Sequence, residues 1–133
     1  MTAAPNAWTR PQTLGEVADA ASSMEDFHAN VRDFLHAFKS SPNRDRIAVE
    51  PALLREKFPR GEIADAYLAA VAVELSLDLA CARPKWTQTS ARVLDRPWFA
   101  AWTDGLRIIL LHESPAGFRE RNLFVSENAL SVA

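Results

Sequence analysis

The sequence has little of what many small folds and catalytic sites depend on. Its single cysteine, Cys81, cannot form an internal disulfide, which favours a cytoplasmic location. Its four glycines form no Gly-rich loop of the kind that binds nucleotides or dinucleotides. No apolar run is long enough to cross a bilayer, and residues 1–13 lack the apolar stretch of a signal peptide. The sequence therefore argues against a disulfide scaffold, these nucleotide-binding enzymes and a membrane protein.

Patterns for catalysis and metal binding are also missing. The histidines, His28, His36 and His112, are never three or four residues apart, as two zinc ligands on one helical face would be. Ser114 stands in the segment HESPAG, which is not a nucleophile elbow, and no general base can be assigned to it. We therefore predict no catalytic residues, no metal site and no cofactor.

Length and composition are those of one ordinary globular domain. The chain has 133 residues, of which 48% are hydrophobic and 24% charged, so it can bury a core without a disulfide or a metal. The net charge of −2 argues against nucleic-acid binding by this chain alone. Residues 1–81 carry a net charge of −4, and residues 82–133 carry +2. That division suits an acidic partner or a homodimer, or it reflects uneven sampling of a solvated surface.

Residues 13–133 are predicted to form a single all-α domain, an irregular bundle of about five to seven helices. Capping-box spacing at Thr13 and again at Ser22 marks the starts of two helices. An apolar stripe over residues 24–38 is typical of a helix that packs on a core. The run from 61 to 82 is apolar nearly all round, which places this helix at the centre of the bundle.

Several shorter segments complete the predicted bundle. Residues 1–12 are expected to form a flexible arm, with Trp8 as the one residue that docks. The run 104–112 fits either a helix or a buried strand, and we favour a helix because no other segment offers a strand to pair with it. The remaining short helices are expected at residues 44–49, 50–58, 115–122 and 126–133.

The block from 84 to 126 carries the candidate binding residues. It is dense in Trp and Arg, the residue types enriched at the hot spots of protein interfaces. The predicted partner-binding residues are Trp86, Arg96, Trp98, Arg119, Arg121 and Phe124. As an alternative, Arg96, Arg119 and Arg121 line a pocket of a small enzyme or ligand-binding domain and hold an anionic small molecule. A purely structural role is also open, in which Trp and Pro fasten loops to the core and Arg lies around them.

The amino-acid sequence of this block resembles that of a known family. An Ala-rich helix is followed by Pro84 and Trp86, by LDRPWF at 94–99 and by SPAGFRERNLFVSENAL at 114–130. This pattern is similar to short bacterial proteins and to the C-terminal part of antitoxin-type helix-turn-helix regulators. The resemblance covers about residues 60–133, and the front stretch 13–38 is also similar.

The resemblance implies an interaction module of a toxin–antitoxin gene pair, with a toxin as its protein partner. It transfers no catalytic signature. A helix-turn-helix reading unit is not visible, because the break near residues 40–43 lacks a Gly-centred turn and the flanking helices are not basic.

Overall fold

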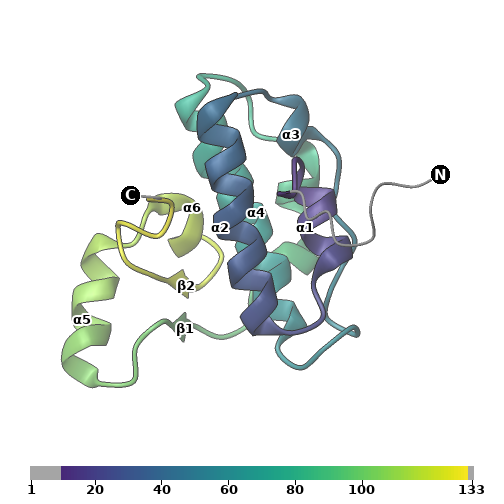
Figure 1. Ribbon diagram of the computed structural model, residues 1–133. Coiled ribbons are helices and arrows are strands. Elements are labelled where there is room, and N and C mark those ends of the chain that lie inside the picture. Colours follow the sequence, from purple (N-terminus) through teal and green to yellow (C-terminus); the bar gives the residue numbers. More distant parts are fainter. Residues whose placement is uncertain (1–9, 132–133) are drawn as a thin grey trace.

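One long helix, α4, forms the axis on which the other elements are arranged (Figure 1). The structure is a computed structural model, and it describes residues 10–131. The predicted docking of Trp8 and most of the predicted arm therefore lie outside the described residues. The elements are α1 (Leu14–Ala20), α2 (Met24–Ser40), α3 (Asp45–Ala48), α4 (Gly61–Asp78), η1 (Lys85–Gln88), η2 (Ser90–Arg92), β1 (Trp98–Phe99), α5 (Asp104–Glu113), α6 (Ala116–Arg119) and β2 (Leu123–Phe124). With six α-helices among these residues, the predicted all-α fold is confirmed.

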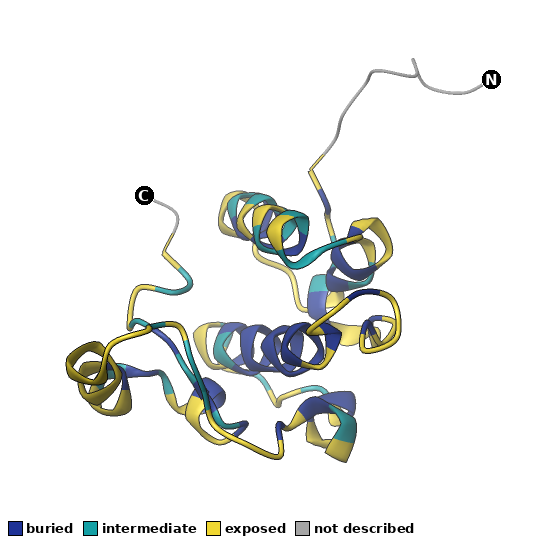
Figure 2. Ribbon diagram, turned by 90° about the horizontal axis from the view of Figure 1, so that it is seen from below, coloured by how far each residue is buried: buried dark blue, intermediate teal, exposed yellow. Residues whose placement is uncertain are grey.

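The central position predicted for α4 is confirmed. Its side chains are buried from Ile63 to Val73 without a break, as expected for a helix that is apolar on all sides. Helix α2 packs on one face of α4, and η1, η2 and α6 pack on the other (Figure 2). Tyr67 of α4 joins these layers, because its ring lies edge-on to Phe27 of α2 at 5.9 Å and to Phe118 of α6 at 5.0 Å between centroids.

The first two helices begin close to their predicted caps. The Thr13 hydroxyl accepts a hydrogen bond from the backbone N–H of Glu16 at 3.1 Å, as the capping signal predicts. For α2 the cap is Ser23 rather than the predicted Ser22. Asp26 accepts hydrogen bonds from the backbone N–H groups of both serines, which shifts the start by one residue.

The helix predicted over residues 50–58 is absent: residues 51–54 have no regular structure, and residues 55–60 form turns and a bend. The reason lies in α4. Asp65 is fully buried there and accepts a hydrogen bond from the backbone N–H of Leu54 at 2.6 Å. That N–H is one that a helix entering at Pro51 would otherwise use in its own first turns. A tertiary contact thus overrides a reasonable helix-entry signal.

Helix α4 also ends four residues before the predicted position, at Asp78. Ala80 adopts the left-handed conformation with φ of 54°, and the N–H of Cys81 donates to the carbonyl of Ser76 at 3.0 Å. This is the hydrogen bond of a Schellman cap, which normally relies on glycine. Because alanine stands in the left-handed position, the sequence carries no visible stop signal before Pro84.

The helix predicted at 104–112 is confirmed as α5. The reason given for it, that no other segment offers a strand, was wrong. Two segments do pair as strands: β1 and β2 are parallel, with Trp98 opposite Leu123 and Phe99 opposite Phe124. The helix predicted over 115–122 is confined to α6. The terminal helix predicted from residue 126 is replaced by turns as far as the described residues extend. Ser126 and Asn128 accept short-range hydrogen bonds that form these turns in place of a helix.

Candidate protein-binding surface

Two of the six predicted partner-binding residues are buried and bind within the chain. Trp86 packs in the core, and its indole N–H donates to the carbonyl of Ile47 at 3.1 Å. Arg121 is 2% exposed, and its guanidinium donates to the carbonyls of Gly117 at 2.9 Å and Thr87 at 2.6 Å. Both side chains fasten loops to the body. This is the purely structural role that the sequence left open for Trp and Arg.

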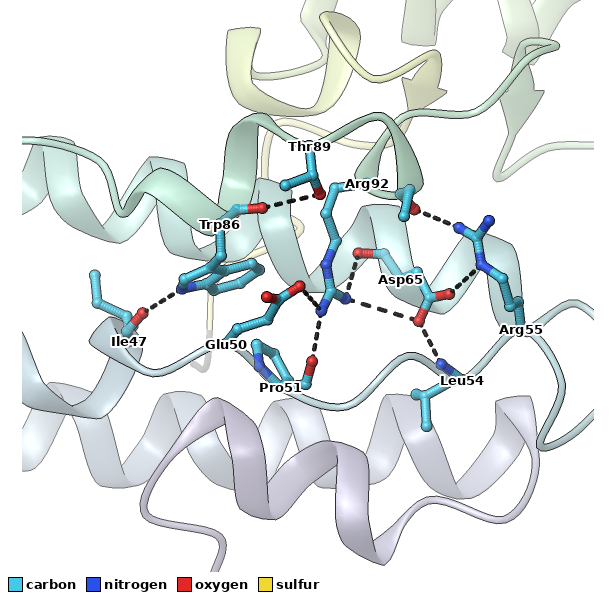
Figure 3. A network of polar contacts seen from close by, with 10 residues as sticks. Ile47, Glu50, Pro51, Leu54, Arg55, Asp65, Trp86, Thr89 and Arg92 are labelled. Carbon is cyan, nitrogen blue, oxygen red and sulfur yellow. Dashed lines mark hydrogen bonds and ion pairs between the residues drawn. The ribbon is translucent and has the colours of Figure 1, made fainter.

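A second buried arginine, Arg92, also fastens loops to the body, through more contacts than Arg121 makes. It was not among the predicted site residues. Its guanidinium donates to Pro51 O at 2.5 Å and to the carboxylate of Glu50 at 3.1 Å, and lies 4.9 Å from the Trp86 ring centroid (Figure 3). Burial lowers the pKa of Arg92, while Glu50 and Asp65 raise it. The network joins the loop after α3, the start of α4 and η2, so it stabilises the fold.

A smaller charged cluster fixes α6. Glu120 accepts hydrogen bonds from the guanidinium groups of Arg121 at 2.5 Å and Arg83 at 2.6 Å. Burial raises the pKa of Glu120, but these two arginines outweigh that effect and hold it below its usual value. The cluster ties the segment after α4 to the end of α6.

The other four predicted residues keep exposed surface. Arg96 and Arg119 are exposed, and Trp98 and Phe124 are half-buried. Phe124 stacks on Phe99 across the strand pair, with 4.7 Å between ring centroids. These four residues, on the loop before β1, on the two strands and on α6, remain candidates for partner contact.

The described hollows do not bring the three predicted anion-binding arginines together. Arg96 lines one of about 350 Å³ beside the carboxylates of Glu62 and Asp95, which oppose a bound anion. Arg121 lines a separate one of about 220 Å³, and Arg119 lines neither.

A smaller hollow of about 180 Å³ lies between α2, α4 and the C-terminal segment. Its lining includes His28, Arg32 and Tyr67. Burial lowers the pKa of His28, and the nearby positive charge of Arg32 lowers it further. Burial raises the pKa of Tyr67 to about 12. Near neutral pH this hollow therefore presents two uncharged polar groups beside one cation.

The most unusual surface belongs to α5, which lies to one side of the body (Figure 1). Of its five aliphatic side chains only that of Leu110 is buried. The exposed ones are 45–56% accessible, and Trp102, just before the helix, is 87% accessible. We call these residues the α5 surface: Trp102, Leu106, Ile108, Ile109 and Leu111. The apolar run LRIILL was the available signal, but it was interpreted only as a helix or a buried strand.

The start of α5 is held by contacts with the residues just before it, and its end is hydrogen-bonded to the segment after β2. At its start the hydroxyl of Thr103 accepts from the N–H of Leu106 at 3.2 Å. The guanidinium of Arg107 donates to the carbonyl of Ala101 and lies 5.7 Å from the Phe99 ring centroid. At its end the buried hydroxyl of Ser114 accepts from the N–H of Val125 at 2.7 Å. The helix is thus positioned firmly while most of its apolar side chains stay exposed.

Replacing Ser114 with alanine should lower the free energy of unfolding by about 1–3 kcal/mol, because it strips a buried N–H of its acceptor. The Ser114 hydroxyl also lies 2.7 and 2.8 Å from the carbonyl oxygens of Leu110 and Val125, so it closes the end of α5 on the neighbouring segment. Urea unfolding followed by circular dichroism measures the loss. Ser90→Ala, which removes an exposed hydroxyl, is the control, and an equal loss in both variants would contradict the assignment.

Comparisons with family models, curated proteins and solved structures found no match to this chain. The similarity to antitoxin-type regulators therefore rests on the sequence motifs alone. Over residues 10–131, no helix has the length and apolarity to cross a bilayer, and no three His, Cys, Asp or Glu side chains gather as metal ligands would.

Proposed function

We propose that this protein is a non-catalytic protein-binding module and that the α5 surface is its main contact with another chain. The observation that supports this is the exposure of four aliphatic side chains and a tryptophan around one well-positioned helix. Scattered apolar residues are common on protein surfaces, but four exposed aliphatic side chains on one ten-residue helix are a concentration that favours an interaction site.

The energetics of α5 support the same conclusion. A ten-residue helix is too short to be stable in water without tertiary contacts, and within the described chain α5 has one buried aliphatic anchor, Leu110. Each aliphatic side chain moved fully out of water contributes roughly 1.5–3 kcal/mol. A partner that covers Ile108, Ile109 and Leu111 therefore supplies stabilisation that the isolated fold leaves unused.

The sequence resemblance suggests an antitoxin role, in which the bound chain is a toxin. Support for this finer proposal comes from the motifs at 94–99 and 114–130, which flank α5 in the sequence. The partly exposed residues Arg96, Trp98, Arg119 and Phe124 are of the types that form interface hot spots, and they supply a polar and aromatic margin for such a contact.

Replacing Ile108 with glutamate should weaken binding of a toxin by about 30-fold or more, because a charge is placed in the apolar contact. The partner to test is the product of the adjacent gene, co-expressed and co-purified with this chain, with affinity then measured by calorimetry. Ile108 is 56% exposed, so the fold should tolerate the change and circular dichroism should be unaltered.

Val49→Glu is the matched control, because Val49 is another exposed aliphatic residue, placed after α3 and away from α5. It should bind like the unchanged chain. If Ile108→Glu binds the partner as tightly as Val49→Glu does, the α5 surface is not the contact. If no neighbouring gene product binds at all, the antitoxin proposal is wrong.

A further inference from the structure

We infer that the hollow between α2, α4 and the C-terminal segment is a binding site for a small organic monocarboxylate. Its volume is about 180 Å³, and it is lined from three segments that are distant in the sequence. These segments bring together one cation, several hydrogen-bond donors and an aliphatic wall. None of the lining residues belongs to the α5 surface, so the inference goes beyond the proposed function and does not depend on it.

Helix α2 contributes both polar and apolar side chains to this hollow. The four lining residues of α2 are His28, Val31, Arg32 and Leu35. Their spacings of three and four place them on one face of the helix. Val31 and Leu35 are buried, His28 is half-buried and Arg32 is exposed. The aliphatic side chains therefore form the inner wall, and the cation lies closer to solvent.

The charge of the lining favours an anion. Arg32 makes no ion pair with any carboxylate among the residues that the structure describes. No Asp or Glu lines this hollow, whereas the hollows beside Arg96 and Arg121 each include at least one carboxylate. An anion that enters beside Arg32 is attracted by the guanidinium and meets no opposing negative charge in the lining.

Tyr67 of α4 brings a nearly buried hydroxyl to the hollow. The residue is 8% exposed, and its ring lies edge-on to those of Phe27, His28 and Phe118. The hydroxyl takes part in no hydrogen bond with the residues described, although a buried hydroxyl normally has a partner. Burial raises the pKa of Tyr67 to about 12, so the hydroxyl keeps its proton near neutral pH. It is therefore available to donate to a bound carboxylate.

The C-terminal segment forms the third side of the hollow, through Ala129 and Ser131. Two turns hold these residues: the N–H of Ala129 donates to the carbonyl of Ser126 at 3.0 Å, and that of Ser131 to the carbonyl of Asn128 at 2.9 Å. The methyl group of Ala129 extends the aliphatic wall, and the hydroxyl of Ser131 adds a donor. The lining thus suits a ligand with a charged head and a short apolar body.

The volume limits the size of that ligand. An apolar cavity of about 150 Å³ holds one benzene molecule. A hollow of about 180 Å³ therefore suits a carboxylate whose apolar body is about as large as one ring, and benzoate is a simple probe of this kind. Its carboxylate would pair with Arg32 and accept from Tyr67, while its ring contacts the aliphatic wall. We expect a dissociation constant of about 1 mM or tighter, the order that so small a ligand reaches.

An NMR titration of the isotope-labelled chain with benzoate tests the site. The largest shifts of backbone amide signals should occur in α2 around Arg32, at Tyr67 and at residues 129–131. Benzamide has nearly the same shape without the charge, and acetate has the charge without the ring. Each should bind at least tenfold more weakly than benzoate, because each loses one of the two kinds of contact. An absence of saturable shifts, shifts centred elsewhere, or benzamide that binds as tightly as benzoate would overturn the inference.

Two variants test the assigned residues. Arg32→Gln should raise the dissociation constant of benzoate at least tenfold, because it removes the cation at an exposed position where the fold tolerates the change. Tyr67→Phe keeps the packed ring and removes only the hydroxyl, and it should raise the constant by about tenfold. Circular dichroism of both variants should match that of the native chain.

Arg44→Gln is the matched control, because Arg44 is an exposed arginine that lines none of these hollows. It should bind benzoate like the native chain. If Arg32→Gln binds benzoate as tightly as Arg44→Gln does, or if Tyr67→Phe binds it as tightly as the native chain does, the inference is wrong.

Discussion

Replacing Asp65 with alanine should lower the free energy of unfolding by about 3–5 kcal/mol, the range measured when one partner of a buried ion network is removed. The Asp65 side chain is fully buried, and its carboxylate accepts from the N–H of Leu54 at 2.6 Å and from Arg55 Nε at 3.1 Å. A guanidinium nitrogen of Arg92 lies 3.7 Å away. The substitution leaves the buried Arg92 with less of the negative charge that offsets its burial (Figure 3).

Urea unfolding followed by circular dichroism measures this loss. Asp65→Asn should fall between the native chain and Asp65→Ala, because the amide oxygen can still accept from Leu54 while the charge is lost. Asp78→Ala, at the exposed end of α4, should change the free energy of unfolding by less than about 0.5 kcal/mol. Equal effects of Asp65→Ala and Asp78→Ala would show that the network contributes nothing.

Replacing Gly61 with alanine should be at least as damaging, with a loss of about 3 kcal/mol or more. A β-carbon at Gly61 would lie 1.8 Å from the carbonyl oxygen of Leu54, and this neighbour is backbone rather than the end of a flexible side chain. Insertion of one carbon into a tight site usually costs about 1–3 kcal/mol, and here the backbone itself must move. The start of α4 and the loop at Leu54 would have to separate.

Thermal unfolding of Gly61→Ala and Gly15→Ala makes the comparison. Gly15 also lies near a helix start, but its added β-carbon would meet only the hydroxyl of Thr13 at 3.6 Å, an ordinary contact. Gly15→Ala should be neutral or slightly stabilising, since alanine is the better helix former. A Gly61→Ala chain as stable as Gly15→Ala would show that the loop at Leu54 yields without cost.

Periodicity and capping residues were sufficient to predict α1, α2 and α4, because these helices follow rules that are local in sequence. The pattern at α5 fitted a helix and a strand equally well. The failures came from contacts that are distant in sequence and from local conformations that the residue type does not reveal. The loop at 51–60 is shaped by Asp65, and the end of α4 depends on a left-handed alanine at Ala80. The pairing of β1 with β2 joins two-residue segments too short to have a recognisable pattern.

For the candidate site, residue type alone could not separate exposed from buried side chains. Trp86 and Arg121 are of the hot-spot types, yet both are fastened inside the chain. In the opposite direction, no binding residue was predicted within the apolar run of α5, and most of that run is exposed. Exposure depends on what the rest of the chain places beside a segment, and hydrophobic pattern does not specify that.

The strand pair has a consequence for how the chain could diversify. The N–H of Ala100 donates to the carbonyl of Phe124 at 3.0 Å, and the Ser114 hydroxyl holds the backbone of the next residue, Val125. The segment between them, which contains α5, therefore leaves the body and returns to almost the same point. Lengthening a segment whose two ends are held close together costs little chain entropy. The length and sequence of this segment can thus change while the network around Asp65 stays intact.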